Sequence, residues 1–262
     1  MVYDCFMFFN ELDLLEIRLA ELYPLVDYFV LCESPITHSG QEKPLYFKDN
    51  MHRYLKYLNK IVHRVVPEET MLAMNSSWGR ENFQRDYCAA EITFKYDDII
   101  ISSDCDEIPS AKSLVEFEAE TRKIYNTTIK TAHMTCYYGR LTNKIILPRD
   151  HQPWRGSTFV RVRDEVNGVS LSGLRAAKDS FPPIVCGWHF SYLGGVEAMK
   201  YKITSFAHTE YDKEEILNSL DKSYNNRKDP LGRPEFIIDQ VDIDCSYPRE
   251  IYSNLYKYEH LL

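Results

Sequence analysis

Short apolar runs alternate with segments of helical periodicity over the first 122 residues, and this alternation constrains the fold more than any other feature of the chain. Runs of the length of buried strands occupy residues 5–9, 28–32, 61–66 and 99–103. Runs of this kind are typical of strands in a parallel sheet. The pattern therefore predicts an α/β protein with an open, mostly parallel twisted sheet and helices on both faces.

Helical segments lie between these runs. Leucines at positions 12, 15, 19 and 22 recur at helical spacing, and Pro24 ends that segment. Residues 79–96 are predicted as another helix, with Phe83 and Phe94 on its apolar face. Further along, the pattern predicts strands at 129–138, 157–162 and 184–191, a helix near 195–206 and a polar tail. Sheets of this type bind ligands at the carboxyl ends of their strands.

The composition is that of a folded globular protein. Hydrophobic residues make up 44% of the 262 residues and charged residues 27%, which excludes disordered and collagen-like chains. The length favours a single domain over residues 1–262. Lys and Arg total 31 against 39 Asp and Glu, a net charge of -8, and no basic run is present to follow a phosphate backbone. Nucleic acid is therefore not an expected partner.

The sequence carries no signal for a membrane or for secretion. No stretch approaches the roughly 20 apolar residues that span a bilayer, and the first residues have neither a basic region nor a small-residue cleavage site. The seven cysteines are an odd set without CxxC spacing, which is unlike a disulfide framework or a zinc cluster. These features predict a soluble cytoplasmic protein with free thiols.

Two carboxylates follow the predicted strand at 99–103. Asp104 and Asp106 are separated by one residue, so both can reach one hard cation, and Mg²⁺ or Mn²⁺ bridging a diphosphate is the expected use. A solvated acidic loop would show the same pattern, and the chain has a second Asp-x-Asp at residues 242–244. Only the first pair stands at a strand end in the alternating region, where such sheets bind ligands.

The predicted helix before the acidic strand carries Arg80, Gln84 and Arg85. Arginine can bind a diphosphate bidentately, and a surface salt-bridge pair is the alternative. The polar loop at residues 33–40 follows another strand end and is suited to contact a nucleotide or only to turn the chain.

Two histidines add candidates for the site. His189 lies among aromatic residues and is either a metal ligand or a hydrogen-bonded core residue. His208 stands two residues before Glu210, with a helix C-cap as the alternative. Nucleophile elbows, P-loops and GxGxxG fingerprints are missing, which argues against hydride transfer on a dinucleotide fold and against ATP hydrolysis by a P-loop.

Together these segments resemble glycosyltransferase family 17, the family of the β-1,4-mannosyl-glycoprotein 4-β-N-acetylglucosaminyltransferase. The matching segments are 9–18, 26–45, 97–109 and 187–191, and they cover the chain from about residue 4 to residue 210. The resemblance implies a GT-A type nucleotide-sugar fold, with a nucleotide-binding part over about residues 1–125 and an acceptor-side part over about 126–262. It also implies a UDP-GlcNAc donor and a glycan or glycoprotein acceptor.

The resemblance implies relatives in animals that are anchored in Golgi membranes, and we expect this chain to lack their anchor and stem. We therefore expect a compact bacterial or viral form that acts in the cytoplasm, with an acceptor other than an N-glycan.

The resemblance and the residue chemistry assign roles to particular side chains. Asp106 is the expected first metal ligand, Asp104 is expected on the ribose or on a metal-bound water, and His189 is expected to complete the coordination sphere or to touch a phosphate. The base that takes the acceptor proton is Glu210 or Glu107. Glu210 is preferred, because inversion places the base across the sugar from the metal and Glu107 adjoins a metal ligand. The residues expected to bind the donor are Asn10, Glu33, His38, Arg80, Gln84, Arg85 and Asp104.

Two functions from other classes fit the same fold. A non-catalytic module that binds glycans or nucleotide sugars is one, and the intact Asp104 and Asp106 argue against it. A metal-dependent phosphohydrolase is the other, and the lack of His-rich two-metal spacing argues against it.

Overall fold

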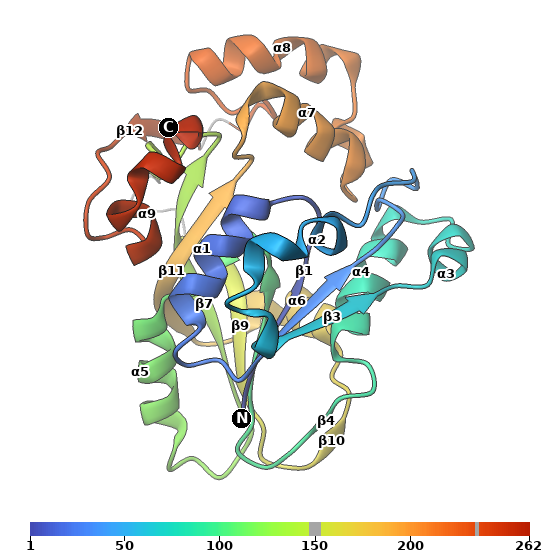
Figure 1. The fold of residues 1–262 in the computed structure, drawn as a ribbon, viewed down its shortest axis with the longest axis vertical. Helices are drawn as coiled ribbons and strands as arrows, with labels where there is room; N and C mark the ends of the chain where they lie inside the picture. The colour runs from blue at the N-terminus through green and yellow to red at the C-terminus, as the bar shows by residue number, and fades with distance from the viewer. Residues whose placement is uncertain (147–152, 234–235) are drawn as a thin grey trace.

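The computed structural model describes residues 1–146, 153–233 and 236–262 (Figure 1). Its strands are β1 (Val2–Met7), β2 (Tyr28–Glu33), β3 (Ile61–Val65), β4 (Thr93–Phe94), β5 (Ile99–Asp104), β6 (Glu107–Ile108), β7 (Thr128–Tyr138), β8 (Asn143–Ile146), β9 (Trp154–Arg161), β10 (Val166–Asn167), β11 (Pro183–Ser191) and β12 (Ile237–Gln240). Its α-helices are α1 (Leu12–Leu22), α2 (Tyr46–Asp49), α3 (Glu68–Leu72), α4 (Ser77–Ala89), α5 (Ala111–Thr121), α6 (Leu171–Ala177), α7 (Gly195–Ser205), α8 (Glu214–Asn225) and α9 (Arg249–Ser253).

One large mixed sheet runs through the described part of the chain. Its strand order is β12-β8-β7-β9-β5-β1-β2-β3, and β11 pairs with β7. Strands β3, β2, β1 and β5 are parallel, whereas β9 is antiparallel to both of its neighbours, β5 and β7. The predicted α/β class is confirmed. Apart from the two-residue β6, which is antiparallel to β11, the antiparallel strands of this sheet come from the chain beyond residue 122, where the regular alternation of strand and helix stops.

Alternation along β1 explains why helices cover both faces of the sheet. Phe6 and Phe8 belong to a core shared with buried residues of α1 and α5. Tyr3 and Cys5 point to the opposite face, into a core shared with α4 and α6. Successive strand side chains point to opposite faces, so a strand that is buried on both faces needs cover on both. Figure 1 shows α1 and α5 on one side of the strands and α4 on the other.

The structure corrects the helix predicted over residues 79–96. Ser76 caps the start of α4, where its hydroxyl accepts a hydrogen bond from the Gly79 N–H at 3.2 Å, and the helix ends at Ala89. Phe94 is buried as the helical pattern required, but it lies in β4, which pairs with β10. Phe94 is therefore buried in a short strand, although its spacing from the apolar residues of α4 is that of a helix.

The C-terminal part holds more regular structure than the predicted polar tail. It contains α8, β12 and α9. Figure 1 shows α7 and α8 together at the end of the molecule opposite the N-terminus. The sequence did not predict α8, because its residues are mostly polar. The structure buries one side chain of this helix fully, that of Leu220.

Candidate active site

A cavity of about 630 Å³ opens where β1, β5 and β11 end. Its lining includes residues at or after the ends of β1, β5 and β11, others from α4, α6 and α7, and three from elsewhere in the chain. They are Phe8, Phe9, Asp104, Asp106, His189 and Ser191, then Glu81, Gln84, Arg85, Arg175 and Lys202, and finally His38, Trp154 and His208. Small-molecule sites occupy roughly 300–1,000 Å³, so the cavity has the size of such a site. It lies at the edge of the sheet where the sequence predicted ligand binding.

A buried arginine holds the acidic loop in place. Arg18 of α1 is fully buried and pairs with Asp4 of β1, with its Nε 2.8 Å from Asp4 Oδ2. Its Nη1 donates to the backbone carbonyls of Asp104 at 3.1 Å and Glu107 at 2.9 Å. Buried donors that lose their acceptors are costly. Arg18 therefore fixes the backbone of residues 104–107 against α1.

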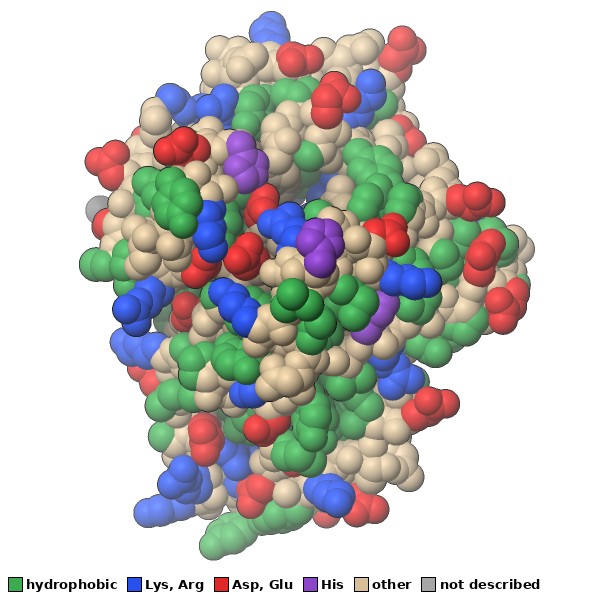
Figure 2. All heavy atoms as spheres, viewed as in Figure 1, with side chains coloured by type: hydrophobic (Ala, Val, Ile, Leu, Met, Phe, Trp, Pro, Cys, Tyr) green, Lys and Arg blue, Asp and Glu red, His purple; other side chains and the backbone are tan. Residues whose placement is uncertain are grey.

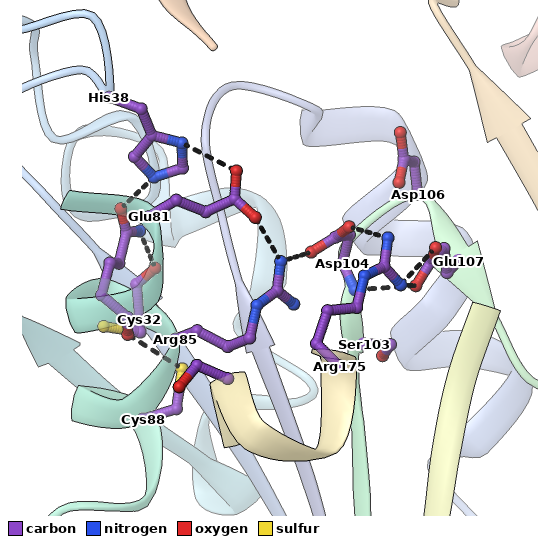
Figure 3. Close-up of polar contacts among 12 residues, drawn as sticks. Cys32, His38, Glu81, Arg85, Cys88, Ser103, Asp104, Asp106, Glu107 and Arg175 are labelled. Carbon is purple, nitrogen blue, oxygen red and sulfur yellow. Dashed lines mark hydrogen bonds and ion pairs between the residues drawn. The ribbon is translucent and has the colours of Figure 1, made fainter. Parts of the chain in front are cut away.

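Asp104 lies between two arginines from different helices (Figure 3). Arg85 Nη2 of α4 is 2.8 Å from Asp104 Oδ1, and Arg175 Nη2 of α6 is 2.9 Å from Oδ2. Burial by itself raises the pKa of Asp104, but Arg175 and Arg85 outweigh it and hold that pKa well below its ordinary range. Arg85 is 2% exposed, and within the described structure its Nε and Nη1 are buried without a hydrogen-bond partner.

A line of polar contacts continues from Arg85 to the far wall of the cavity (Figure 3). Glu81 lies 3.0 Å from Arg85 Nη2 and 3.9 Å from His38 Nδ1. His38 Nε2 is 3.0 Å from Gln84 Oε1, and the Gln84 amide donates to the carbonyl of Cys32 at 2.9 Å. The structure thus brings four of the residues predicted to bind the donor into one cavity wall: His38, Gln84, Arg85 and Asp104.

The other three predicted donor-binding residues make contacts within the protein and are absent from the cavity lining that the structure describes. Glu33 is fully buried and accepts a hydrogen bond from the Phe47 N–H at 2.7 Å. Arg80 donates to backbone carbonyls, including that of His38 at 3.0 Å. The N–H of Asn10 donates to the carboxylate of the next residue at 3.1 Å.

Glu107, one of the two predicted bases, is fully buried behind the cavity. Both of its carboxylate oxygens lie 2.8 Å from Arg175 Nη1, and Oε1 also accepts from Trp154 Nε1 at 2.8 Å. The Asp104 N–H donates to Oε2 at 3.2 Å. These contacts make Glu107 the anchor of Arg175, which in turn faces Asp104.

Asp106 belongs to a second group of contacts in the same cavity. Lys202 Nζ of α7 is 2.6 Å from Asp106 Oδ2, and His189 Nε2 is 3.7 Å from it. Burial by itself raises the pKa of Asp106, but Lys202 and His189 outweigh it and hold that pKa well below its ordinary range. Trp154 stacks on the His189 ring at 4.4 Å between centroids, and Cys136 Sγ lies 3.1 Å from Nδ1. Burial lowers the pKa of His189, but Cys136 and Asp106 raise it to about 10.

Strand pairing explains why His189 meets the acidic loop. β6 is antiparallel to β11, and the register sets Glu107 opposite His189. The Phe190 N–H then donates to the carbonyl of Asp106 at 2.9 Å. The sequence motif around His189 and the Asp-x-Asp motif are therefore one structural unit.

The three predicted metal ligands share the cavity, but each carboxylate has its own set of cations. Within the described residues, no three His, Cys, Asp or Glu side chains form a ready metal cage. Mg²⁺ is usually held by one or two carboxylates together with substrate phosphates and water, so a closed protein cage is not required. The hard oxygen donors of Asp106 fit such an ion when a phosphorylated ligand supplies further oxygens. His189 joins them as a ligand only after losing the proton that Cys136 and Asp106 favour.

Glu210, the preferred base, lies near the cavity but outside its described lining. Its side chain is 54% exposed, and its Oε1 is 2.6 Å from Nδ1 of His208. The hydrogen bond from His208 lowers the pKa of Glu210. His208 does line the cavity, and its ring contacts Trp78 at 4.5 Å between centroids.

Sequence analysis missed two cations that contact the Asp-x-Asp motif. Arg175 lies on α6, in a segment where no element was predicted, and no local spacing linked it to Asp104. Lys202 lies on the predicted helix near 195–206. One feature of the sequence could have indicated Lys202: the helix that carries it directly follows the strand that carries His189.

On the face that Figure 2 shows, acidic and basic side chains are interspersed, in keeping with the absence of a basic run. Among the described residues, no helix combines the length and the apolar character needed to cross a membrane.

The sheet gathers carboxylates and buried guanidinium groups at the ends of its parallel strands, the edge at which open α/β sheets bind their ligands. A model of the family described as Glycosyltransferase family 17 matches residues 1–226. The chain belongs to this family of glycosyltransferases, as the sequence motifs indicated.

Three curated relatives are each named beta-1,4-mannosyl-glycoprotein 4-beta-N-acetylglucosaminyltransferase. The proteins of Homo sapiens and Rattus norvegicus are 28% identical to this chain over 110 residues, and that of Mus musculus is 27% identical over the same length. Each match covers 38% of this chain and 20% of the relative. The chain is thus matched to about a fifth of the length of these relatives.

Proposed function

We propose that the chain is an inverting glycosyltransferase that moves N-acetylglucosamine from UDP-GlcNAc to a hydroxyl group of a glycan or glycoprotein acceptor. Membership of family 17 and the names of the relatives support the reaction class and the sugar. The observation that carries the proposal is the state of Arg85. The buried guanidinium of Arg85, a residue of the cavity lining beside Asp104, has two nitrogens without a hydrogen-bond partner, and guanidinium N–H groups match a diphosphate.

Under this proposal the donor lies along the line of polar contacts. Its diphosphate pairs with Arg85 near the end of β5, and its nucleoside reaches toward His38 and Gln84. This orientation follows the carboxyl edge of β1 and β5, where doubly wound sheets bind nucleotides. It is also the orientation expected if the fold is of the GT-A type.

We assign Mn²⁺ or Mg²⁺ to Asp106 and His189, with Asp104 on the ribose or on a metal-bound water. When bound, the ion neutralises the charge that develops on the leaving diphosphate. The carboxylate of Asp106 is kept ionised by its cationic neighbours, so it is ready to act as a ligand at neutral pH.

The transfer needs a base on the side of the sugar opposite the diphosphate. The acceptor oxygen forms a bond to the anomeric carbon while the bond from that carbon to the diphosphate oxygen breaks, and UDP leaves with the electron pair. We propose that the acceptor proton passes to Nε2 of His208, with Glu210 holding Nδ1 as the positioning residue. Glu210 would then assist the proton transfer indirectly, by orienting the imidazole of His208, which lines the cavity.

Product analysis tests this proposal. The protein is incubated with UDP-GlcNAc, Mn²⁺ and a panel of glycans, and the products are examined by mass spectrometry and NMR. We expect one acceptor to gain a single N-acetylhexosamine in β linkage, because the sugar of UDP-GlcNAc is α-linked. An α-linked product would contradict inversion, and transfer from another nucleotide sugar alone would contradict the donor.

A further inference from the structure

Lys202 pairs with Asp106, the carboxylate that we assign to the metal. Its Nζ lies 2.6 Å from Asp106 Oδ2 and 3.5 Å from Glu11 Oε1, and it stands 5.6 Å from the centroid of the Tyr192 ring. The side chain is 24% exposed, whereas that of Asp106 is 7% exposed.

A metal ion and this ammonium compete for the same carboxylate. A divalent ion bound to Asp106 would place two positive charges next to the ammonium of Lys202, which contacts the same carboxylate. The place is partly buried, so solvent screens this repulsion poorly. Of the described carboxylates that Lys202 contacts, Glu11 would remain as a partner for the displaced ammonium. Metal binding without the donor therefore carries an electrostatic cost that Asp106 would not have without Lys202.

The donor removes that cost. Its diphosphate brings negative charge into the cavity that Lys202 also lines, and the long flexible lysine stem lets the ammonium move to a phosphate oxygen. We infer that Lys202 is the exchangeable counter-ion of Asp106: it excludes the metal from the empty site and moves to the diphosphate when donor and metal bind together. This inference rests on the proposed function and adds the order in which the site fills.

The exchange has a consequence for the reaction. When the anomeric bond breaks, negative charge on the diphosphate increases, and an ammonium already placed on it stabilises that charge. After transfer, the return of Lys202 to Asp106 favours release of UDP together with the metal. Lys202 would thus act both in the transfer step and in product release.

Titration with Mn²⁺ alone tests the inference without any turnover. Binding is followed by the EPR signal of free Mn²⁺ for the wild type, Lys202→Met and Lys200→Met. Lys200 is exposed on the same helix and is outside the described cavity lining, so it is a matched control. We expect Lys202→Met to bind Mn²⁺ at least about tenfold more tightly than the wild type, within the usual range of site coupling, and Lys200→Met to match the wild type.

Two further measurements complete the test. UDP should raise the Mn²⁺ affinity of the wild type by a larger factor than that of Lys202→Met, because only the wild type has an ammonium to relocate. Lys202→Arg keeps the charge and should keep the weak Mn²⁺ binding of the wild type. Should Lys202→Met fail to fold, Lys202→Gln removes the same charge with a polar side chain.

Equal or weaker Mn²⁺ binding by the neutral variants would overturn the inference. If sugar transfer persists in that case, the proposed function stands and only the exchange is wrong. If no protein binds Mn²⁺ even with UDP, while transfer proceeds in EDTA, the metal assignment fails together with the inference, and the transferase function still stands.

Discussion

Arg175 joins Glu107 to Asp104: its Nη1 lies 2.8 Å from both oxygens of Glu107, and its Nη2 lies 2.9 Å from Asp104 Oδ2. The carboxylate that follows the Asp-x-Asp motif therefore acts from behind the cavity. It positions a guanidinium that faces the motif.

This relationship predicts that Glu107→Gln is mainly a stability variant. The amide leaves Arg175 partly unpaired in a buried place, and breaking a buried pair costs about 3–5 kcal/mol. We expect the free energy of unfolding in urea to fall by about 3 kcal/mol, near the lower end because an amide oxygen can still accept from Trp154. Glu118→Gln, which changes an exposed carboxylate on α5 paired with Arg122, should change it by less than about 0.5 kcal/mol.

A Glu107→Gln protein of wild-type stability that binds the donor but loses transfer would contradict this view. It would return Glu107 to the role of base that the sequence left open.

The pair of His208 and Glu210 predicts a loss of transfer with unchanged donor binding. His208→Gln and Glu210→Gln should lower the transfer rate by about 10²–10⁴-fold, the usual contribution of a positioned base, while the UDP-GlcNAc affinity measured by calorimetry stays the same. Glu215→Gln is the control, because Glu215 is exposed at the start of α8.

Full transfer by both variants would sink this assignment. The remaining described carboxylates of the cavity that are outside the Asp-x-Asp motif, Glu11 and Glu81, would then be tested as the base in the same assay.

Gly187 is predicted to be essential for the approach of β11 to β6. It has a φ of +67°, and a Cβ there would lie 2.1 Å from the carbonyl oxygen of Ile108 and 2.8 Å from Cα of Pro109. Gly232→Ala is a matched control, since Gly232 has a φ of +74° but no heavy atom within 4 Å of the added Cβ. Gly232→Ala should cost about 1 kcal/mol from backbone strain alone.

Gly187→Ala should cost at least about 2 kcal/mol more than Gly232→Ala, because backbone atoms of residues 108 and 109 must move. Equal costs in thermal unfolding would show that β6 is free to shift, and would weaken the account of how His189 reaches Asp106.

The cysteines predict a reducing site of action. Each of the six cysteines whose side chains the structure describes is a free thiol, and five of them are buried. Titration of denatured, unreduced protein from its native source should therefore count all seven thiols of the sequence. Two or more stable disulfides would contradict the expectation, drawn from the sequence, that the protein acts in the cytoplasm.

Sequence reasoning located the elements whose signals are local. The apolar runs, the leucine spacing of α1 and the Asp-x-Asp motif at the end of β5 all act through near neighbours in the chain, and each was found. The helix at 79–96 was predicted too long because Phe94 is buried at helical spacing. Spacing alone does not distinguish a buried residue of a helix from one of a short strand such as β4.

The rest of the site depends on tertiary contacts. Lys202 meets Asp106 across 96 residues and Arg175 meets Asp104 across 71, and no spacing rule links residues so far apart. Glu33 was expected at the ligand because it is polar at a strand end, and Arg80 because an arginine can bind a diphosphate. In the structure both satisfy backbone groups of the loops that shape the cavity, a need that buried N–H and C=O groups impose.

Release of UDP from UDP-GlcNAc tests the central claim most directly. It is measured with Mn²⁺, with and without glycan acceptors, for the wild type, Asp106→Ala and Asp242→Ala, the last from the exposed second Asp-x-Asp. We predict UDP release that acceptors stimulate, that Asp106→Ala abolishes without unfolding and that Asp242→Ala leaves unchanged. Release of inorganic phosphate in place of UDP, or equal release by Asp106→Ala and the wild type, would contradict a glycosyltransferase centred on this cavity.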